Sequence, residues 1–253
     1  MSFRYLKNNI NFASFYEQLF GSQKQDLEFY KYYIEKNGGL ALEIGSGTGR
    51  LLLPYLQLDL NVEGIEPDEA MSKICMKKSV NLKLKPIIYQ QKLENLNIQK
   101  KYKTIYMPLF VFQNIIERDK VFSALKLAYE HLDQNGEILI SIFIPWNDPT
   151  GTWEQTWRVT KVDKNNDEIL VLSESVSFDK FEQIQTKYFK YEMFNKNFLS
   201  KSYITMINFR TYSRYELISL MEQIGYKDIE IFGDYEILEA CSNTQTFIFC
   251  ARR

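Results

Sequence analysis

A glycine-rich turn follows a short apolar run near residue 40. Residues 40–44 are apolar except for Glu43, and Gly45, Ser46, Gly47, Thr48 and Gly49 come directly after them. Glycine allows positive φ and a close approach of a ligand to the backbone, and a helix that begins after such a turn points its unpaired N–H groups at that ligand. The pattern therefore predicts a strand that ends in a turn able to bind a small molecule.

A carboxylate stands at the end of the next apolar run. Residues 62–65 are typical of a second strand, and Glu66 follows them immediately. A carboxylate at the tip of the second strand of such a unit can accept the hydroxyl protons of a ribose. The turn and the carboxylate together indicate a nucleoside-like ligand, with Glu66 as the residue that binds its ribose.

The spacing of the glycines restricts the kind of nucleoside. It is G-x-G-x-G, whereas the fingerprint of nicotinamide dinucleotide sites is G-x-G-x-x-G. A nicotinamide-dependent oxidoreductase would also need a catalytic tyrosine-lysine or histidine placement, which we do not find in the sequence. We therefore expect a cofactor that has no pyrophosphate.

The segments ALEIGSGTGR and VEGIEPDEAM resemble the first two motifs of the class I S-adenosylmethionine-dependent methyltransferases. In that family the glycine loop contacts the methionine part, the acidic residue binds the ribose, and a residue after the third strand meets the adenine. The resemblance implies S-adenosylmethionine as cofactor and S-adenosylhomocysteine as product. The cofactor-binding residues that it implies are Glu43, Gly45, Ser46, Gly47, Thr48, Gly49, Arg50, Glu66, Pro67, Met71, Gln91, Leu93 and Met107.

Two departures from the family pattern bear on the ligands. The adenine position falls at Gln91, where the family usually has an aspartate, so the hydrogen bond to the adenine amino group would be weaker. Residues 106–114 resemble the fourth-strand segment but lack the Asn/Asp-Pro-Pro-Tyr motif of many enzymes that methylate nucleobase or glutamine amino groups. We therefore expect a small-molecule methyl acceptor.

Methyl transfer from a sulfonium is an in-line displacement, so the protein mainly aligns the reactants and excludes water. A base is needed only if the acceptor must lose a proton, and the catalytic residue stays unassigned. The candidates are Tyr16, Gln113, Arg210 and Tyr212, of which Arg210 could clamp a carboxylate or phosphate on the acceptor. The three cysteines are widely spaced, and no metal site is expected.

The elements that position these residues alternate along the first 145 residues. Strands are expected at 40–44, 62–65, 84–89, 104–109 and 137–144, with helices between them. This alternation predicts a doubly wound, Rossmann-like α/β fold with a mostly parallel sheet. A helix at 214–224 and strands at 229–232 and 246–250 bring the expected sheet to seven strands.

The alternation of expected strands and helices ends after Pro145. Residues 157–162, 169–178, 184–194 and 198–211 have strand character with no helix between them, which predicts an antiparallel insertion. The resemblance implies one methyltransferase domain over residues 1–253. Its parts are an N-terminal helical lid at 1–36, a cofactor-binding core at 37–145 and 212–253, and the insertion at 146–211, as a wall of the acceptor site or a dimer contact.

Composition narrows the partners. The chain has 31 basic and 32 acidic residues and a net charge of -1, so no overall positive field attracts nucleic acid. No run of 18 apolar residues predicts a membrane span, and the odd, unpaired cysteines fit a reducing cytoplasm. A monomer and a homodimer are both open. The alternatives are a non-catalytic protein that binds S-adenosylmethionine or dimerises, and an RNA or protein methyltransferase.

Overall fold

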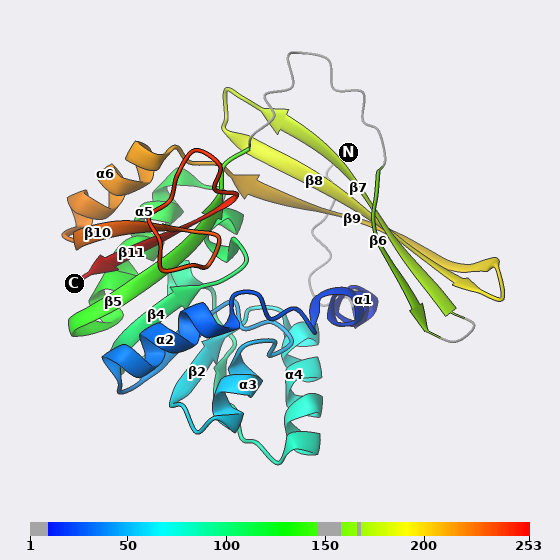
Figure 1. The fold of residues 1–253 in the computed structure, drawn as a ribbon, viewed down its shortest axis with the longest axis horizontal. Helices are drawn as coiled ribbons and strands as arrows, with labels where there is room; N and C mark the ends of the chain where they lie inside the picture. Colours follow the sequence, from blue (N-terminus) through cyan, green and yellow to red (C-terminus); the bar gives the residue numbers. More distant parts are fainter. Residues whose placement is uncertain (1–9, 146–157, 166–167) are drawn as a thin grey trace.

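The computed structural model describes residues 10–145, 158–165 and 168–253 (Figure 1). Within this part of the chain, seven strands form the central sheet in the order β10-β11-β5-β4-β1-β2-β3. The strands β1 to β5 run parallel, and β11 is antiparallel to both β5 and β10. Their bounds are β1 Ala41–Ile44, β2 Val62–Ile65, β3 Ile88–Tyr89, β4 Tyr102–Met107, β5 Leu132–Phe143, β10 Lys227–Gly233 and β11 Thr246–Arg252.

Helices cover both faces of this sheet, which is why β1 and β2 are buried along their whole length. On one face lie α2 (Leu27–Asn37), α3 (Leu52–Gln57) and α4 (Glu69–Leu82), and on the other α5 (Arg118–His131) and α6 (Arg214–Ile224) (Figure 1).

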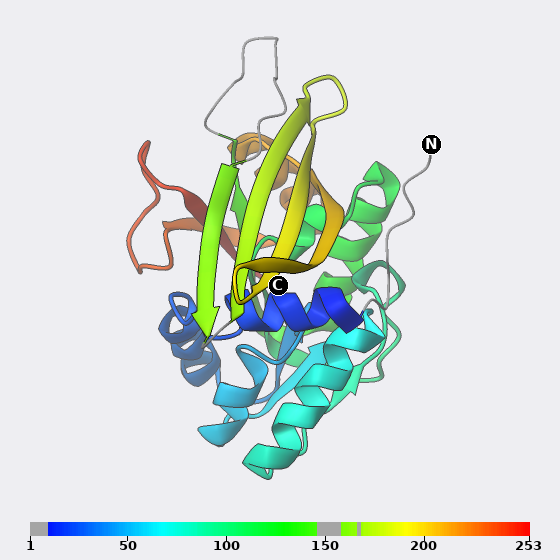
Figure 2. The same cartoon turned by 90° about the vertical axis from the view of Figure 1, so that its right-hand side faces the viewer.

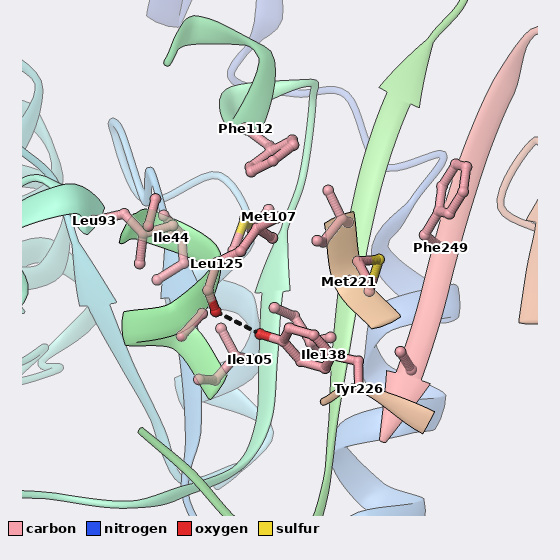
Figure 3. Packing of buried hydrophobic residues seen from close by; sticks show 14 of the residues in the cluster. Ile44, Leu93, Ile105, Met107, Phe112, Leu125, Ile138, Met221, Tyr226 and Phe249 are labelled. Atoms are coloured by element: carbon pink, nitrogen blue, oxygen red, sulfur yellow. Dashed lines mark hydrogen bonds between the residues drawn. The ribbon is translucent and has the colours of Figure 1, made fainter. Parts of the chain in front are cut away.

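The core beneath α5 and α6 is mainly aliphatic, and its buried tyrosines are Tyr102, Tyr212 and Tyr226. Ile105 and Ile138 lie on adjacent strands of the sheet, and Met221 packs on them from α6 (Figure 3). The hydroxyl of Tyr226 donates a hydrogen bond of 2.9 Å to the carbonyl oxygen of Leu125 in α5. The doubly wound fold expected from the sequence is confirmed.

Four antiparallel strands stand between β5 and α6 in the chain and form a second sheet in the order β6-β7-β8-β9. Their bounds are β6 Arg158–Asn165, β7 Glu168–Asp179, β8 Ile184–Asn195 and β9 Phe198–Arg210. The expected insertion is thus confirmed. The first residues of the expected insertion, 146–157, lie outside the described residues.

The helix α1 (Ile10–Phe20) lies between the insertion and the central domain. Figure 2 shows it in dark blue, crossing below the second sheet and above α4. Phe15 and Leu19 pack against Leu170, Leu172 and Tyr191 of the insertion, while Ala13 packs against Met71 of α4. Through α1, the insertion is therefore packed onto the carboxyl edge of the central sheet.

A few local elements differ from the expectations. The strand β3 is two residues long and not six, because Lys83 ends α4 in a left-handed conformation and Pro86 has no N–H to donate to a strand ladder. Two short 3-10 helices, η1 (Leu93–Asn95) and η2 (Val111–Asn114), were not expected. No helix in the described ranges is long and apolar enough to cross a membrane.

Candidate functional site

The glycine turn is fixed to the ends of β1 and β2. The backbone N–H groups of Gly45 and Ser46 both donate to the carbonyl oxygen of Ile65, at 2.8 and 2.9 Å. Gly45, Gly47 and Gly49 have φ values of 74°, 54° and 79°, a region that L side chains rarely adopt. The turn therefore has the backbone geometry that requires its three glycines.

The three glycines differ in what a side chain would meet. A Cβ on Gly49 would lie 2.4 Å from Cys75 Sγ, and one on Gly45 would lie 2.7 Å from Val111 Cγ1. The nearest atom to a Cβ on Gly47 is a backbone oxygen at 3.9 Å. Gly45 and Gly49 thus face packed protein, whereas Gly47 faces open space where a ligand can lie.

Glu66 joins this open position to the start of α4. Its Oε2 accepts a hydrogen bond of 2.8 Å from Gly47 N–H, and its Oε1 accepts one of 2.8 Å from Asp68 N–H. Burial raises the pKa of Glu66 to about 7, although the two backbone donors act in the opposite direction. The structure therefore places Glu66, the residue predicted to bind the ribose, at the glycine turn.

Other polar atoms of the turn have no partner. The hydroxyls of Ser46 and Thr48 are buried and make no hydrogen bond. Glu43 accepts one of 3.2 Å from the Tyr106 hydroxyl, and burial raises the pKa of Glu43 to about 8. Because buried polar groups normally have partners, the two unpaired hydroxyls fit a site that a polar ligand completes.

Tyr16 covers this group of carboxylates from α1. The charges of Glu66, Glu43 and Arg50 act on its hydroxyl, and burial raises the pKa of Tyr16 to about 12. Met71 packs beside Tyr16, whereas Pro67 is exposed. The phenol of Tyr16 stays protonated at neutral pH, so it can donate a hydrogen bond but cannot serve as a base.

Arg50, expected among the cofactor-binding residues, is committed elsewhere. Its guanidinium forms a bidentate pair with Asp26, at 2.5 and 2.6 Å, and donates to the carbonyl oxygen of Gln23 at 3.0 Å. Both side chains are almost fully buried. We therefore assign Arg50 the role of tying the glycine turn to the segment before α2, and not contact with the cofactor.

Three of the four catalytic candidates hold the junction between the two sheets. The fully buried Gln113 donates to the carbonyl oxygens of Phe143 and Arg210 and accepts from Phe143 N–H. The guanidinium of Arg210 donates to the carbonyl oxygens of Ile116 and Glu182. Tyr212 is buried and stacks on Phe112. Gln113 and Arg210 are thus bonded to backbone groups, whereas the buried hydroxyl of Tyr212 has no partner among the described residues.

The residues expected near the adenine are also engaged in contacts within the protein. The Oε1 of Gln91 accepts a hydrogen bond of 2.9 Å from Asn97 N–H and so closes its own loop. The side chains of Leu93 and Met107 are buried in the core. Of the residues expected here, Leu93 and Met107 can offer a ligand only their backbone.

The sequence analysis did not single out Gln185 and Lys187 on β8. Their two-residue spacing places them on one face of the strand, and Lys187 lies over aromatic rings at the junction of the two sheets. Because side chains alternate along a strand, the sequence predicts that Gln185 and Lys187 share a face. It does not show whether that face turns toward the core.

Residues 42–140 match the family model of the methyltransferase domain. This part of the chain is therefore similar to a methyltransferase domain. The match confirms the family resemblance seen in the sequence, and S-adenosylmethionine is the cofactor of that family. An uncharacterized methyltransferase of Bacillus pumilus (strain SAFR-032) is 34% identical over 74 residues. The match covers 26% of this chain and only 35% of that protein.

Solved methyltransferase structures share the fold along nearly the whole chain. An S-adenosylmethionine-dependent methyltransferase from Clostridium acetobutylicum ATCC 824 has a TM-score of 0.76 at 18% identity, over 96% of this chain and 97% of that one. The sugar N-methyltransferase KedS8 from Streptoalloteichus sp ATCC 53650 has a TM-score of 0.75 at 12% identity, over 100% and 96%. The likeness includes the insertion as well as the cofactor-binding core.

Proposed function

We propose that this protein transfers the methyl group of S-adenosylmethionine to an amino group of a small molecule. The observation that carries the proposal is the arrangement of Gly47 and Glu66. A buried carboxylate lies 2.8 Å from the N–H of the one glycine in the turn that faces open space. This arrangement lies at the carboxyl edge of the sheet, where open α/β folds bind their ligands.

The residues present fit the cofactor. Glu66 would accept hydrogen bonds from the ribose hydroxyls, and Gly47 leaves room for the cofactor chain against the backbone. The unpaired hydroxyls of Ser46 and Thr48 are donors for its polar groups. When bound, S-adenosylmethionine supplies an electrophilic methyl group on a positively charged sulfur.

The rest of the site positions and shields the reactants. In our proposal α1 acts as a lid and the insertion as a wall of the acceptor site, so that Tyr16 and the second sheet keep water away from the reacting groups. Water exclusion and alignment are the main requirements of an in-line displacement. In this proposal the core binds the cofactor, α1 covers the site, and the insertion forms a wall of the acceptor site.

Nitrogen is the acceptor atom that suits this site best. A neutral amine attacks the methyl group without the help of a base, and Tyr16, Gln113 and Arg210 supply none: Tyr16 stays protonated, and an amide or a guanidinium does not take up a proton at neutral pH. KedS8, which shares the fold over the whole chain, is a sugar N-methyltransferase. These points support an amine acceptor.

The test is formation of S-adenosylhomocysteine in the presence of matched acceptors. Purified protein is incubated with S-adenosylmethionine and either an amino sugar or the corresponding hydroxy sugar, with a panel of such pairs. We expect product with amino sugars only, and less of it with the Glu66→Ala variant at a limiting concentration of S-adenosylmethionine. Product with hydroxy sugars alone would contradict transfer to nitrogen, and no binding of S-adenosylmethionine would contradict the proposal as a whole.

A further inference from the structure

One face of β8 turns toward the core and α1. Side chains alternate along a strand, so Gln185, Lys187, Phe189 and Tyr191 share a face. Tyr191 packs against Phe15 of α1 with a distance of 5.5 Å between the ring centroids, which shows where this face points. Gln185 and Lys187 therefore lie on the inner face of the insertion.

A row of aromatic rings links Lys187 to the end of β4. The ammonium group of Lys187 lies 5.0 Å from the ring centroid of Phe143 and 5.7 Å from that of Phe209. The Phe143 ring is in turn 5.0 Å from that of Phe110, which follows β4. Phe110 lies at the carboxyl edge of the central sheet, where the cofactor is proposed to bind. The row of rings therefore places Lys187 along this same edge.

The charge of Lys187 has no ion-pair partner in the part of the chain that the structure describes. The side chain is half-buried. Burial lowers the pKa of Lys187, while Glu174 on β7, the cross-strand neighbour of Phe189, acts in the opposite direction. Lys190 on the outer face of the same strand pairs with Glu192 at 3.1 Å. A cation withdrawn from water is costly unless an anion accompanies it, so Lys187 is suited to an anion that comes from outside the protein.

A second polar atom on the same face also has no partner. The Oε1 of Gln185 is buried and makes no hydrogen bond. Gln185 stands two residues before Lys187, and its cross-strand neighbour is Phe209, one of the two rings beneath the ammonium group. A cation, an unpaired acceptor and flat apolar rings thus share one small area.

We infer that Lys187 and Gln185 bind the methyl acceptor, and that this acceptor carries an anionic group, a carboxylate or a phosphate. The anion pairs with Lys187, a hydroxyl or N–H group of the acceptor donates to Gln185, and the apolar part lies on Phe143 and Phe209. The amine to be methylated then points toward β4, away from the positive charge that would repel its protonated form. This inference rests on the proposed function for the identity of the site.

The test is a calorimetric titration of the protein saturated with S-adenosylhomocysteine. The probes are benzoate and phenyl phosphate, with benzamide as a neutral probe of nearly the same shape as benzoate. We expect the wild type to bind at least one anion about tenfold or more tightly than benzamide, since hydrogen bonds to charged groups have that strength. The tighter of the two anions indicates whether the acceptor carries a carboxylate or a phosphate.

Three variants test whether Lys187 is the residue that causes the preference for the anion. Lys187→Met should lose the preference for the anion, Lys187→Arg should keep it, and Lys190→Met, on the opposite face, should behave as the wild type. Equal anion binding by the wild type and Lys187→Met, or no preference over benzamide in the wild type, would overturn the inference.

The first step of each titration separates the two proposals. Normal binding of S-adenosylhomocysteine by a variant shows that it is folded. Failure of the wild type to bind S-adenosylhomocysteine would count against the proposed function alone, since the anion titration can then be repeated on the free protein.

Discussion

At the residue scale, Glu66 is the side chain whose contacts bear most directly on the cofactor. It is 7% exposed and holds Gly47 N–H and Asp68 N–H with its two carboxylate oxygens. We predict that Glu66→Ala weakens S-adenosylmethionine binding by about 1.5 to 3 kcal/mol, the range for hydrogen bonds to a charged group. Calorimetry measures this, with the half-exposed Glu69→Ala as control. Equal affinity of the folded Glu66→Ala variant and the wild type would remove Glu66 from the site.

The glycines of the turn make a second residue-scale prediction. Gly47→Val should abolish cofactor binding while the fold persists, because the branched side chain would extend into the open space beside the turn. Gly49→Val should lower the thermal midpoint strongly, because its Cβ would collide with Cys75 Sγ and Leu53 Cγ. Circular dichroism and calorimetry on both variants check this. Normal binding by Gly47→Val would make the turn purely structural.

The buried carboxylates predict how stability depends on pH. The pKa values of Glu43 and Glu66 rise from 4.5 to about 8 and about 7. Between pH 5 and 8 the folded protein therefore holds protons that the unfolded chain has released, and the free energy of unfolding falls as pH rises. The thermal midpoint of the ligand-free protein should be lower at pH 8 than at pH 5, with a smaller difference for Glu66→Gln. An equal or larger pH dependence in that variant would contradict the raised pKa of Glu66.

At the element scale, the pair of Arg50 and Asp26 joins the glycine turn to the segment before α2. Both partners are buried, so the removal of one leaves the other charge unpaired. We predict that Arg50→Met lowers the free energy of unfolding by about 3 to 5 kcal/mol. Adding Asp26→Leu should restore part of this loss.

Lys31→Met is the matched control for the Arg50 variant, because Glu28, the ion-pair partner of Lys31, is exposed. It should change the free energy of unfolding by at most about 0.5 kcal/mol. Denaturant unfolding measures all three variants. Similar losses for Arg50→Met and Lys31→Met would contradict a role for the buried pair.

The elements were largely predictable from the sequence, whereas the tasks of several side chains were not. Apolar runs and glycines located β1, β2 and the insertion, because their patterns are local. Gln113 and Arg210 were expected at the acceptor, but their partners, such as the carbonyl oxygens of Phe143 and Ile116, are distant in the chain. Lys187 was missed for the same reason. Which face of β8 turns inward depends on how the insertion packs against α1 and Phe143.

At the scale of the whole molecule, two sheets and α1 meet at one edge. The central sheet supplies the glycine turn and Glu66, α1 brings Tyr16 within electrostatic range of Glu66, and the insertion adds the face that carries Lys187. The family match covers residues 42–140, which hold the turn and Glu66. The residues of the proposed acceptor side lie mostly outside that match.

The central claim is that this edge binds S-adenosylmethionine. The most direct measurement is isothermal titration of the purified protein with S-adenosylmethionine, S-adenosylhomocysteine and NAD in parallel. We predict saturable binding of the two sulfur nucleosides and none of NAD, because the turn lacks the glycine spacing that a pyrophosphate needs. Binding of NAD, or of none of the three, would contradict the account.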